Sequence, residues 1–132
     1  MFLYIDTTHS KETCYRVYDE EGRVVKEKIG THAPYPSLNH VSCIDEFLKG
    51  KGRESEMLLR GILVMSGKKG HFSAIRSGVA VANALGYAWN IPVVGMIQGS
   101  GVHEALEQCI AKKGFVKPVL PEYETEPNIG KT

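Results

Sequence analysis

Residues able to carry acid–base or metal chemistry are spread along the chain without forming a known catalytic pattern. The histidines are His9, His32, His40, His71 and His103. No two of them have the spacing of a metal site. His103-Glu104 begins the pattern of a zinc-binding helix, but Glu107 stands where that helix needs its second histidine. There is no G-x-S-x-G elbow and no paired Cys/His or Ser/His signature, so we expect no catalytic residue and no metal ligand.

Two segments could hold a nucleotide. Asp6-Thr7-Thr8 follows an apolar run, at the place where actin-like ATPases put an acid for a metal-bound nucleotide, although Asp6 could equally cap the turn. The glycine-rich stretch from Gly67 to Gly70 separates an apolar run from a helix, and backbone N–H groups at a helix N-terminus can bind phosphate. It matches neither a Walker loop nor a dinucleotide fingerprint, so its glycines could equally serve a sharp turn. The candidate cofactor-binding residues are Asp6, Thr7, Gly67 and Gly70.

Composition and charge narrow the class of protein. The chain has 132 residues, 42% hydrophobic and 23% charged, as is typical of one globular domain. Its 16 basic and 15 acidic residues leave a formal charge of +1, which does not favour direct RNA binding as the main role.

Cys14, Cys43 and Cys109 form no C-x-x-C pair, and we expect Cys14 and Cys109 to be buried. Without a signal peptide or a membrane-length apolar stretch, we expect a cytoplasmic protein that does not bind membranes.

The first part of the chain predicts an antiparallel meander. Apolar or β-prone residues fill positions 2–5, 13–18 and 23–29. Asp19-Glu20-Glu21-Gly22 separates the second run from the third, and Gly22 can adopt the positive φ that a tight hairpin needs. We therefore expect three strands joined by short turns.

The remaining chain alternates helices with strands. Apolar residues at helical spacing predict a first helix from Ser37 to Lys49. The elements expected after it are a buried strand at 62–65, a helix at 73–89, a second fully buried strand at 93–97 and a helix at 102–111. Strands flanked by helices run parallel. We expect one α/β domain over residues 1–114, with a five-stranded mixed sheet in β-β-β-α-β-α-β-α order, and an extended, proline-containing tail at 115–132.

The helix expected at 73–89 is apolar almost all the way round, and Arg76 is its only charged residue. A helix on a sheet normally buries one face, so this helix needs cover on both sides. Gly78, Ala82 and Gly86 recur every four residues and would let another helix approach closely. The pattern favours a protein–protein interface, although the first helix and the tail could provide the same cover.

Four segments resemble a known family. Residues 70–80 (GHFSAIRSGVA) and 90–95 (NIPVVG) are similar to the G-S-F-T-G-L-R-I-G-x-A and I-P-x-x-G-V segments of the TsaB family, also called YeaZ. Residues 5–8 (IDTT) resemble the family's I-D-T-S, and residues 44–48 (IDEFL) resemble its I-D-E-L-L. The segments occur in the family's order across most of the chain.

The resemblance implies a fold, a role and a partner surface. TsaB-like proteins have an actin-like ATPase or ribonuclease H-like fold. They are non-catalytic scaffold or activating subunits that pair with a TsaD-like enzyme, joined by a TsaE-like ATPase, in forming threonylcarbamoyladenosine on tRNA. Such a chain would need no cofactor of its own, although a nucleotide could bind at a shared interface; it would meet tRNA only indirectly and could form a homodimer when alone. The first two helices would supply the interface residues Leu38, Val41, Phe47, Ile75, Gly78, Val79, Ala82, Leu85, Gly86 and Trp89.

Some features depart from the family pattern. The loop has His71 and Ser73 where the family has serine and threonine, and the usual second lobe does not follow Gly114, so we expect a minimal form without it. Apolar residues among the tail's prolines favour a tail that lies against the domain or a partner. The alternative function is a minimal actin-like nucleotide-binding ATPase or a glycoprotease-type peptidase. Against it, the first helix offers only His40, not the His-x-x-x-His pair of TsaD-like enzymes.

Overall fold

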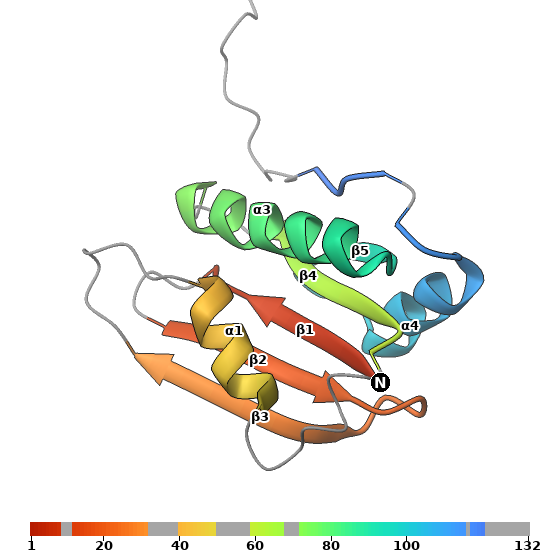
Figure 1. Cartoon of the computed structure of the whole chain (residues 1–132), viewed down its shortest axis with the longest axis horizontal. Coiled ribbons are helices and arrows are strands. Elements are labelled where there is room, and N and C mark those ends of the chain that lie inside the picture. Colours follow the sequence, from red (N-terminus) through yellow and green to blue (C-terminus); the bar gives the residue numbers. More distant parts are fainter. Residues whose placement is uncertain (9–11, 32–39, 50–58, 68–71, 116, 121–132) are drawn as a thin grey trace, which may run out of the picture.

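The computed structural model describes residues 1–8, 12–31, 40–49, 59–67, 72–115 and 117–120. In chain order these residues form β1 (Phe2–Asp6), β2 (Glu12–Tyr18), β3 (Val24–Thr31), α1 (His40–Lys49), β4 (Gly61–Gly67), α3 (Phe72–Trp89), β5 (Val93–Ile97) and α4 (Val102–Ala111) (Figure 1). The prediction of an α/β domain with a five-stranded mixed sheet is confirmed. The strand and helix order predicted for the whole chain is not confirmed, because residues 50–58, between α1 and β4, lie outside the described residues. None of the described helices has both the length and the apolarity needed to cross a lipid bilayer.

The sheet has the strand order β3-β2-β1-β4-β5, which places β1 at its centre. β1 pairs antiparallel with β2, and β2 with β3, as the predicted meander requires. β4 joins the other side of β1 in parallel, and β5 pairs in parallel with β4. Parallel neighbours need a long crossover, and the connections that contain α1 and α3 provide it. α1 and α3 cover one face of the sheet, whereas α4 covers the other (Figure 1).

Strand alternation divides the apolar side chains between two cores, one on each face of the sheet. On β1, Leu3 and Ile5 pack with α1 and α3, whereas Phe2 and Tyr4 pack with α4. All four side chains are buried. Because both faces of this central strand are covered, its sequence is a continuous apolar run.

β3 and β5 form the two edges of the sheet. A strand at 93–97 is confirmed, but the prediction that it is fully buried is wrong, because Gly95 and Ile97 are exposed. An apolar run does not reveal whether a strand has one neighbour or two, and an edge strand keeps one side open. β4 lies between two strands, and its residues are buried apart from the half-buried Met65.

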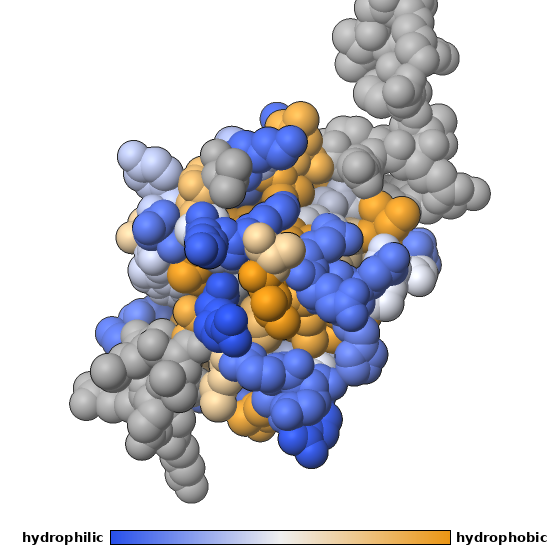
Figure 2. Space-filling view, turned by 90° about the vertical axis from the view of Figure 1, so that its right-hand side faces the viewer, coloured by the Kyte–Doolittle hydropathy of each residue, from blue (hydrophilic) through white to orange (hydrophobic). Residues whose placement is uncertain are grey.

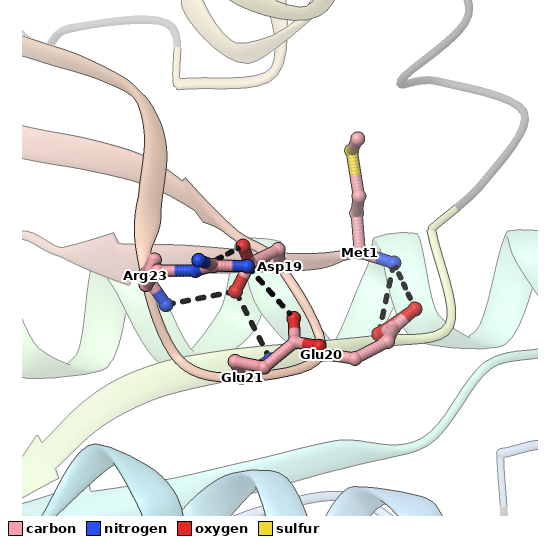
Figure 3. A network of polar contacts seen from close by, with 5 residues as sticks. All are labelled: Met1, Asp19, Glu20, Glu21 and Arg23. Atoms are coloured by element: carbon pink, nitrogen blue, oxygen red, sulfur yellow. Dashed lines mark hydrogen bonds and ion pairs between the residues drawn. The ribbon is translucent and has the colours of Figure 1, made fainter.

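One aspartate holds the hairpin between β2 and β3. Asp19 Oδ1 accepts hydrogen bonds from the backbone N–H groups of Glu21 (3.0 Å) and Arg23 (2.9 Å), and Oδ2 accepts one from Arg23 Nε (3.0 Å) (Figure 3). The backbone hydrogen bond from Arg23 is the main cause of a lowered pKa of Asp19. Gly22 has a φ of 82°, the positive value predicted for this turn. Beside the turn, Glu20 pairs with the amino group of Met1 at 3.1 Å.

Two glycines let α3 approach the sheet closely. A Cβ on Gly78 would collide with the hydroxyl of Thr7, and a Cβ on Gly86 would collide with a methyl group of Val93. Ala82, between them on the same side of the helix, is fully buried. The small residues therefore bring the helix backbone onto its own sheet. This corrects the interpretation that they make room for the helix of a partner.

We predict that Gly78→Val destabilises the domain by about 1–3 kcal/mol, because the added side chain overpacks the contact with Thr7. Ala80→Val is the matched control, since Ala80 is exposed on the same helix and should cost only about 0.5–1 kcal/mol of helix propensity. Urea unfolding followed by circular dichroism measures both. Equal loss of stability in the two variants would contradict the close approach.

Candidate functional site

The carboxylate of Asp6, the candidate nucleotide-binding acid, is engaged by its own neighbours. Oδ1 accepts hydrogen bonds from the backbone N–H of Thr8 (2.9 Å) and from the Thr8 hydroxyl (2.6 Å). Oδ2 accepts a hydrogen bond from the Tyr4 hydroxyl (3.2 Å). Burial, together with the Asp6 charge, raises the pKa of Tyr4, which keeps this hydroxyl a neutral donor. Asp6 thus has the turn-capping contacts that were the alternative to nucleotide binding.

The other candidate cofactor residues share this edge of the sheet or lie outside the described residues. Because β1 and β4 run parallel, Asp6-Thr7 and Gly67 lie at the carboxyl ends of neighbouring strands. Thr7 is 3% exposed. Gly67 is buried, and its carbonyl accepts a hydrogen bond from the Gln98 N–H (2.8 Å). Gly70 lies outside the described residues. The structure brings three of the four candidates to one edge, where their described contacts serve the fold.

The histidine of the first helix has a structural partner that the sequence did not suggest. His40, the first residue of α1, is 8% exposed, and its Nδ1 is hydrogen-bonded to the hydroxyl of Tyr15 on β2 (2.7 Å). Tyr15 is itself buried and packs against Phe47 of α1. These contacts attach α1 to the sheet. Across the described ranges, no three His, Cys, Asp or Glu side chains gather as metal ligands would.

Most residues predicted to contact a partner belong to the interior of this chain. Val41 and Trp89 are exposed (48% and 41%), Leu85 is half-buried, and Leu38 lies outside the described residues. The buried members of the set are Phe47, Ile75, Gly78, Val79, Ala82 and Gly86. The apolar ones pack in the core that α1 and α3 form with the sheet. A side chain that fills the core is not available to a partner, which corrects the interpretation for these residues.

A different set of residues forms the outward side of α3. Ser77, Ala80, Ala84 and Ala88 are exposed, uncharged and spaced by three or four residues, so they share one side of the helix. The exposed side chains of Arg76, four residues before Ala80, and Tyr87, three residues after Ala84, border this side. We call these four residues the outer face of α3. α1 lies beside α3 on the same face of the sheet, with Val41 exposed (Figure 1). Side chains this short would let a second helix approach closely.

Other exposed apolar side chains occur singly or on the β3 edge. Tyr87 and Leu120 are 76% and 74% exposed, and Val24, Val25 and Ile29 of β3 are each about half exposed. On the side shown in Figure 2, hydrophilic side chains surround and interrupt the apolar surface. Scattered apolar residues are normal on protein surfaces and do not by themselves define a site.

The start of the tail lies against α3, which agrees with the prediction of a tail packed on the domain, whereas residues 121–132 lie outside the described residues. The contact with Asn83 was not predicted. Asn83 Oδ1 accepts a hydrogen bond from the Val119 N–H (2.8 Å), and Asn83 Nδ2 donates one to the Val119 carbonyl (2.9 Å). Asn90 Oδ1 accepts another from the Phe115 N–H (3.3 Å), and both tail side chains pack against the core. We call residues 115 and 117–120 the strap. A lone asparagine within an apolar helix was the available signal, because a part-buried amide needs partners.

A pocket of about 320 Å³ lies where the strap passes β5. It is lined by Ser66, Val93, Gly95, Lys112, Lys117, Pro118, Val119 and Leu120. The glycine is needed for its shape, because a Cβ on Gly95 would lie 2.5 Å from Ser66 Oγ and 2.9 Å from Val119 Cγ1. Lys112 and Lys117 are both exposed and are the charged groups among the described lining residues. The pocket therefore has a mixed polar and apolar lining and a basic rim.

The three cysteines are free thiols in two kinds of environment. Cys109 is buried, as predicted, whereas Cys14 is only half-buried, and so is Cys43. Cys14 lies on β2, where α4 does not cover the sheet completely. Burial raises the pKa of Cys109 to about 11 and also raises the pKa of Cys14. Both groups therefore remain protonated thiols near neutral pH, the unreactive form.

The described part of the chain is an α/β domain with an uncharged outer helix face and a basic-rimmed pocket. No protein-family model matches the sequence, and no curated protein is significantly similar to it. A proposal for its function therefore depends on its own residues and on the segment resemblance.

We predict that Asn83→Ala releases the strap and lowers the unfolding free energy by about 1–3 kcal/mol, since two hydrogen bonds worth about 0.5–1.5 kcal/mol each are lost. Hydrogen exchange at the Val119 amide should become faster. Ser77→Ala, on the outer face, is the control and should leave that exchange rate unchanged. An unaltered Val119 exchange rate in the Asn83 variant would show that the strap is held in another way.

We also predict a loss of stability at alkaline pH. Burial raises the pKa of Tyr15 to about 12, above its ordinary value of 10.0, so folding favours the neutral phenol. This contribution is complete below about pH 10 and is lost as the pH rises through about 12. The unfolding free energy should decline from about pH 9 to about pH 11, and Tyr15→Phe should make this decline shallower. The slope is the readout, because the lost hydrogen bond to His40 lowers stability at every pH. An unchanged slope would contradict the raised pKa.

Proposed function

We propose that this chain is a TsaB-like, non-catalytic subunit that pairs with a TsaD-like enzyme in forming threonylcarbamoyladenosine on tRNA in the cytoplasm. The observation that carries the proposal is the outer face of α3, where Ser77, Ala80, Ala84 and Ala88 are exposed without a charge among them. Side chains this short allow a second helix to pack closely against this side.

The segment resemblance and the outer face point to the same element of the fold. Residues 70–80, which carry the most specific similarity, include the first half of α3. The family packs its first two helices on a partner, and α1 and α3 lie side by side on one face of this sheet (Figure 1). The surface proposed for the partner is accordingly the outer face of α3 together with Val41 of α1, rather than the buried residues named from the sequence.

The actin-like or ribonuclease H-like fold is part of this proposal. Its support is the coarse architecture, in which an antiparallel meander continues into two parallel strands with helices on both faces of the sheet. The proposed role needs no catalytic group on this chain. The contacts of Asp6 with Thr8 and Tyr4 favour a capping role at the position where an enzyme of this fold would need a free carboxylate.

Ala84→Arg tests the partner surface directly. The new charge would be buried without a counterion when the partner binds, which costs about 3–5 kcal/mol and should weaken binding by roughly a hundredfold or more. Co-purification with the TsaD-like protein encoded by the same organism, followed by titration calorimetry, gives the measurement. The isolated chain should keep its stability, because Ala84 is exposed.

Gln108→Arg is the matched control, since it adds the same charge at an exposed position of α4, on the opposite face of the sheet. It should bind like the original chain. If the unmodified chain binds no TsaD-like protein, the proposed function is wrong. If it binds and Ala84→Arg binds equally well, the function stands and the interface lies elsewhere.

A further inference from the structure

The open edge of β5 offers backbone groups in a defined direction. The Pro92 carbonyl accepts a hydrogen bond from the Ile62 N–H (2.9 Å), and the Met96 carbonyl accepts one from the Ser66 hydroxyl (3.3 Å), so these residues turn toward β4. Backbone groups alternate in direction along a strand. The N–H and C=O groups of Val93, Gly95 and Ile97 therefore point away from β4, toward the side of β5 that has no strand neighbour in the described residues.

Of these outward residues, Gly95 is the open one. Ile97 is satisfied locally, because its N–H donates to Ser100 Oγ (3.3 Å) and its carbonyl accepts the Ser100 N–H (2.9 Å). Val93 is 4% exposed. Gly95 is exposed, and no described residue hydrogen-bonds to its outward N–H or C=O. One residue of the β5 edge thus retains a free donor and a free acceptor, as the pairing position of an added strand requires.

The same place carries unbalanced positive charge. Lys112 and Lys117 line the pocket with Gly95, and neither forms an ion pair with a described residue. No acidic side chain is among the described residues that line it. The pocket, about 320 Å³ in volume, could admit one or two side chains of a chain segment lying along the edge.

The opposite edge of the sheet lacks these properties. β3 carries Lys26, Glu27 and Lys28 in succession, and its pairing with β2 shifts register at Val17 and Tyr18. Charged residues and irregular pairing are the usual means of preventing strand addition at an edge. The pairing of β5 with β4 also shifts register, between Met65 and Gly67, but β5 itself, with the sequence Val-Val-Gly-Met-Ile, carries no charged residue. The two edges therefore differ in their readiness to accept another strand.

We propose that the β5 edge binds an extended acidic segment of a partner protein, whose backbone pairs with Gly95 while its carboxylates contact Lys112 and Lys117. Charge complementarity favours this occupant over a second copy of the chain. A second copy pairing through its own β5 would bring its equivalent lysines to the same edge and cause repulsion. The site is separate from the outer face of α3 and does not depend on the tRNA-modification role.

The test uses two model peptides and the full chain labelled with nitrogen-15. The acidic probe is acetyl-EVEVEV-amide, and the basic probe is acetyl-KVKVKV-amide. We expect the acidic probe to shift the Gly95 amide resonance and slow its hydrogen exchange, and the basic probe to do neither. The double variant Lys112→Glu/Lys117→Glu should lose roughly tenfold in affinity for the acidic probe and bind the basic probe instead.

Lys113→Glu is the matched control, because Lys113 is an exposed neighbour that does not line the pocket; it should behave like the original chain. Equal binding of both probes, or an unchanged preference in the double variant, would overturn the proposal. Protection of the Gly95 amide without peptide would also overturn it. Protection that grows with protein concentration would assign the edge to a second copy, and protection independent of concentration would assign it to the chain itself.

Discussion

The contact between α3 and the sheet is the constraint on which the rest of the domain depends. Glycine at positions 78 and 86 removes the side chains that would hold the helix away from Thr7 and Val93. The helix backbone therefore lies near the strand ends, and Ala82 fills the space between the two glycines. This packing joins β1, β4 and β5 in one core, since α3 is the helix that crosses between the parallel strands. It also decides which side of α3 is turned outward.

α3, an almost uncharged helix, is covered on more than one side by its own chain. One side packs on the sheet, and the strap covers part of another through the amide of Asn83. The outer face remains, and its residues are short rather than bulky. The strap and the proposed partner therefore do not compete for α3, because they contact different sides of the helix. An apolar helix surface in a small domain need not have a single explanation.

Two aspartates at strand ends show why an acidic residue at a plausible site is weak evidence of chemistry. Asp6 and Asp19 each follow or end a strand, and each accepts hydrogen bonds from residues two to four positions away. Turns leave backbone N–H groups without strand partners, and short acidic side chains are the nearest acceptors. A carboxylate used in this way has a structural role, so its position at a strand end does not by itself indicate a nucleotide site. The polar groups that do remain open, around Gly95 and the two lysines, were not apparent from any motif.

Local patterns in the sequence were sufficient to predict the α/β class, the hairpin at Gly22, and the strand at 93–97 and helix at 102–111 to the residue. These features depend on turn chemistry and side-chain periodicity, which act between near neighbours in the chain. The sequence did not show that β5 is an edge strand, because an apolar run reads the same with one neighbour or two. It also did not show which side of α3 is buried, since both sides are apolar. Only tertiary structure decided these points, because strand order and the choice between core and surface depend on residues far apart in the chain.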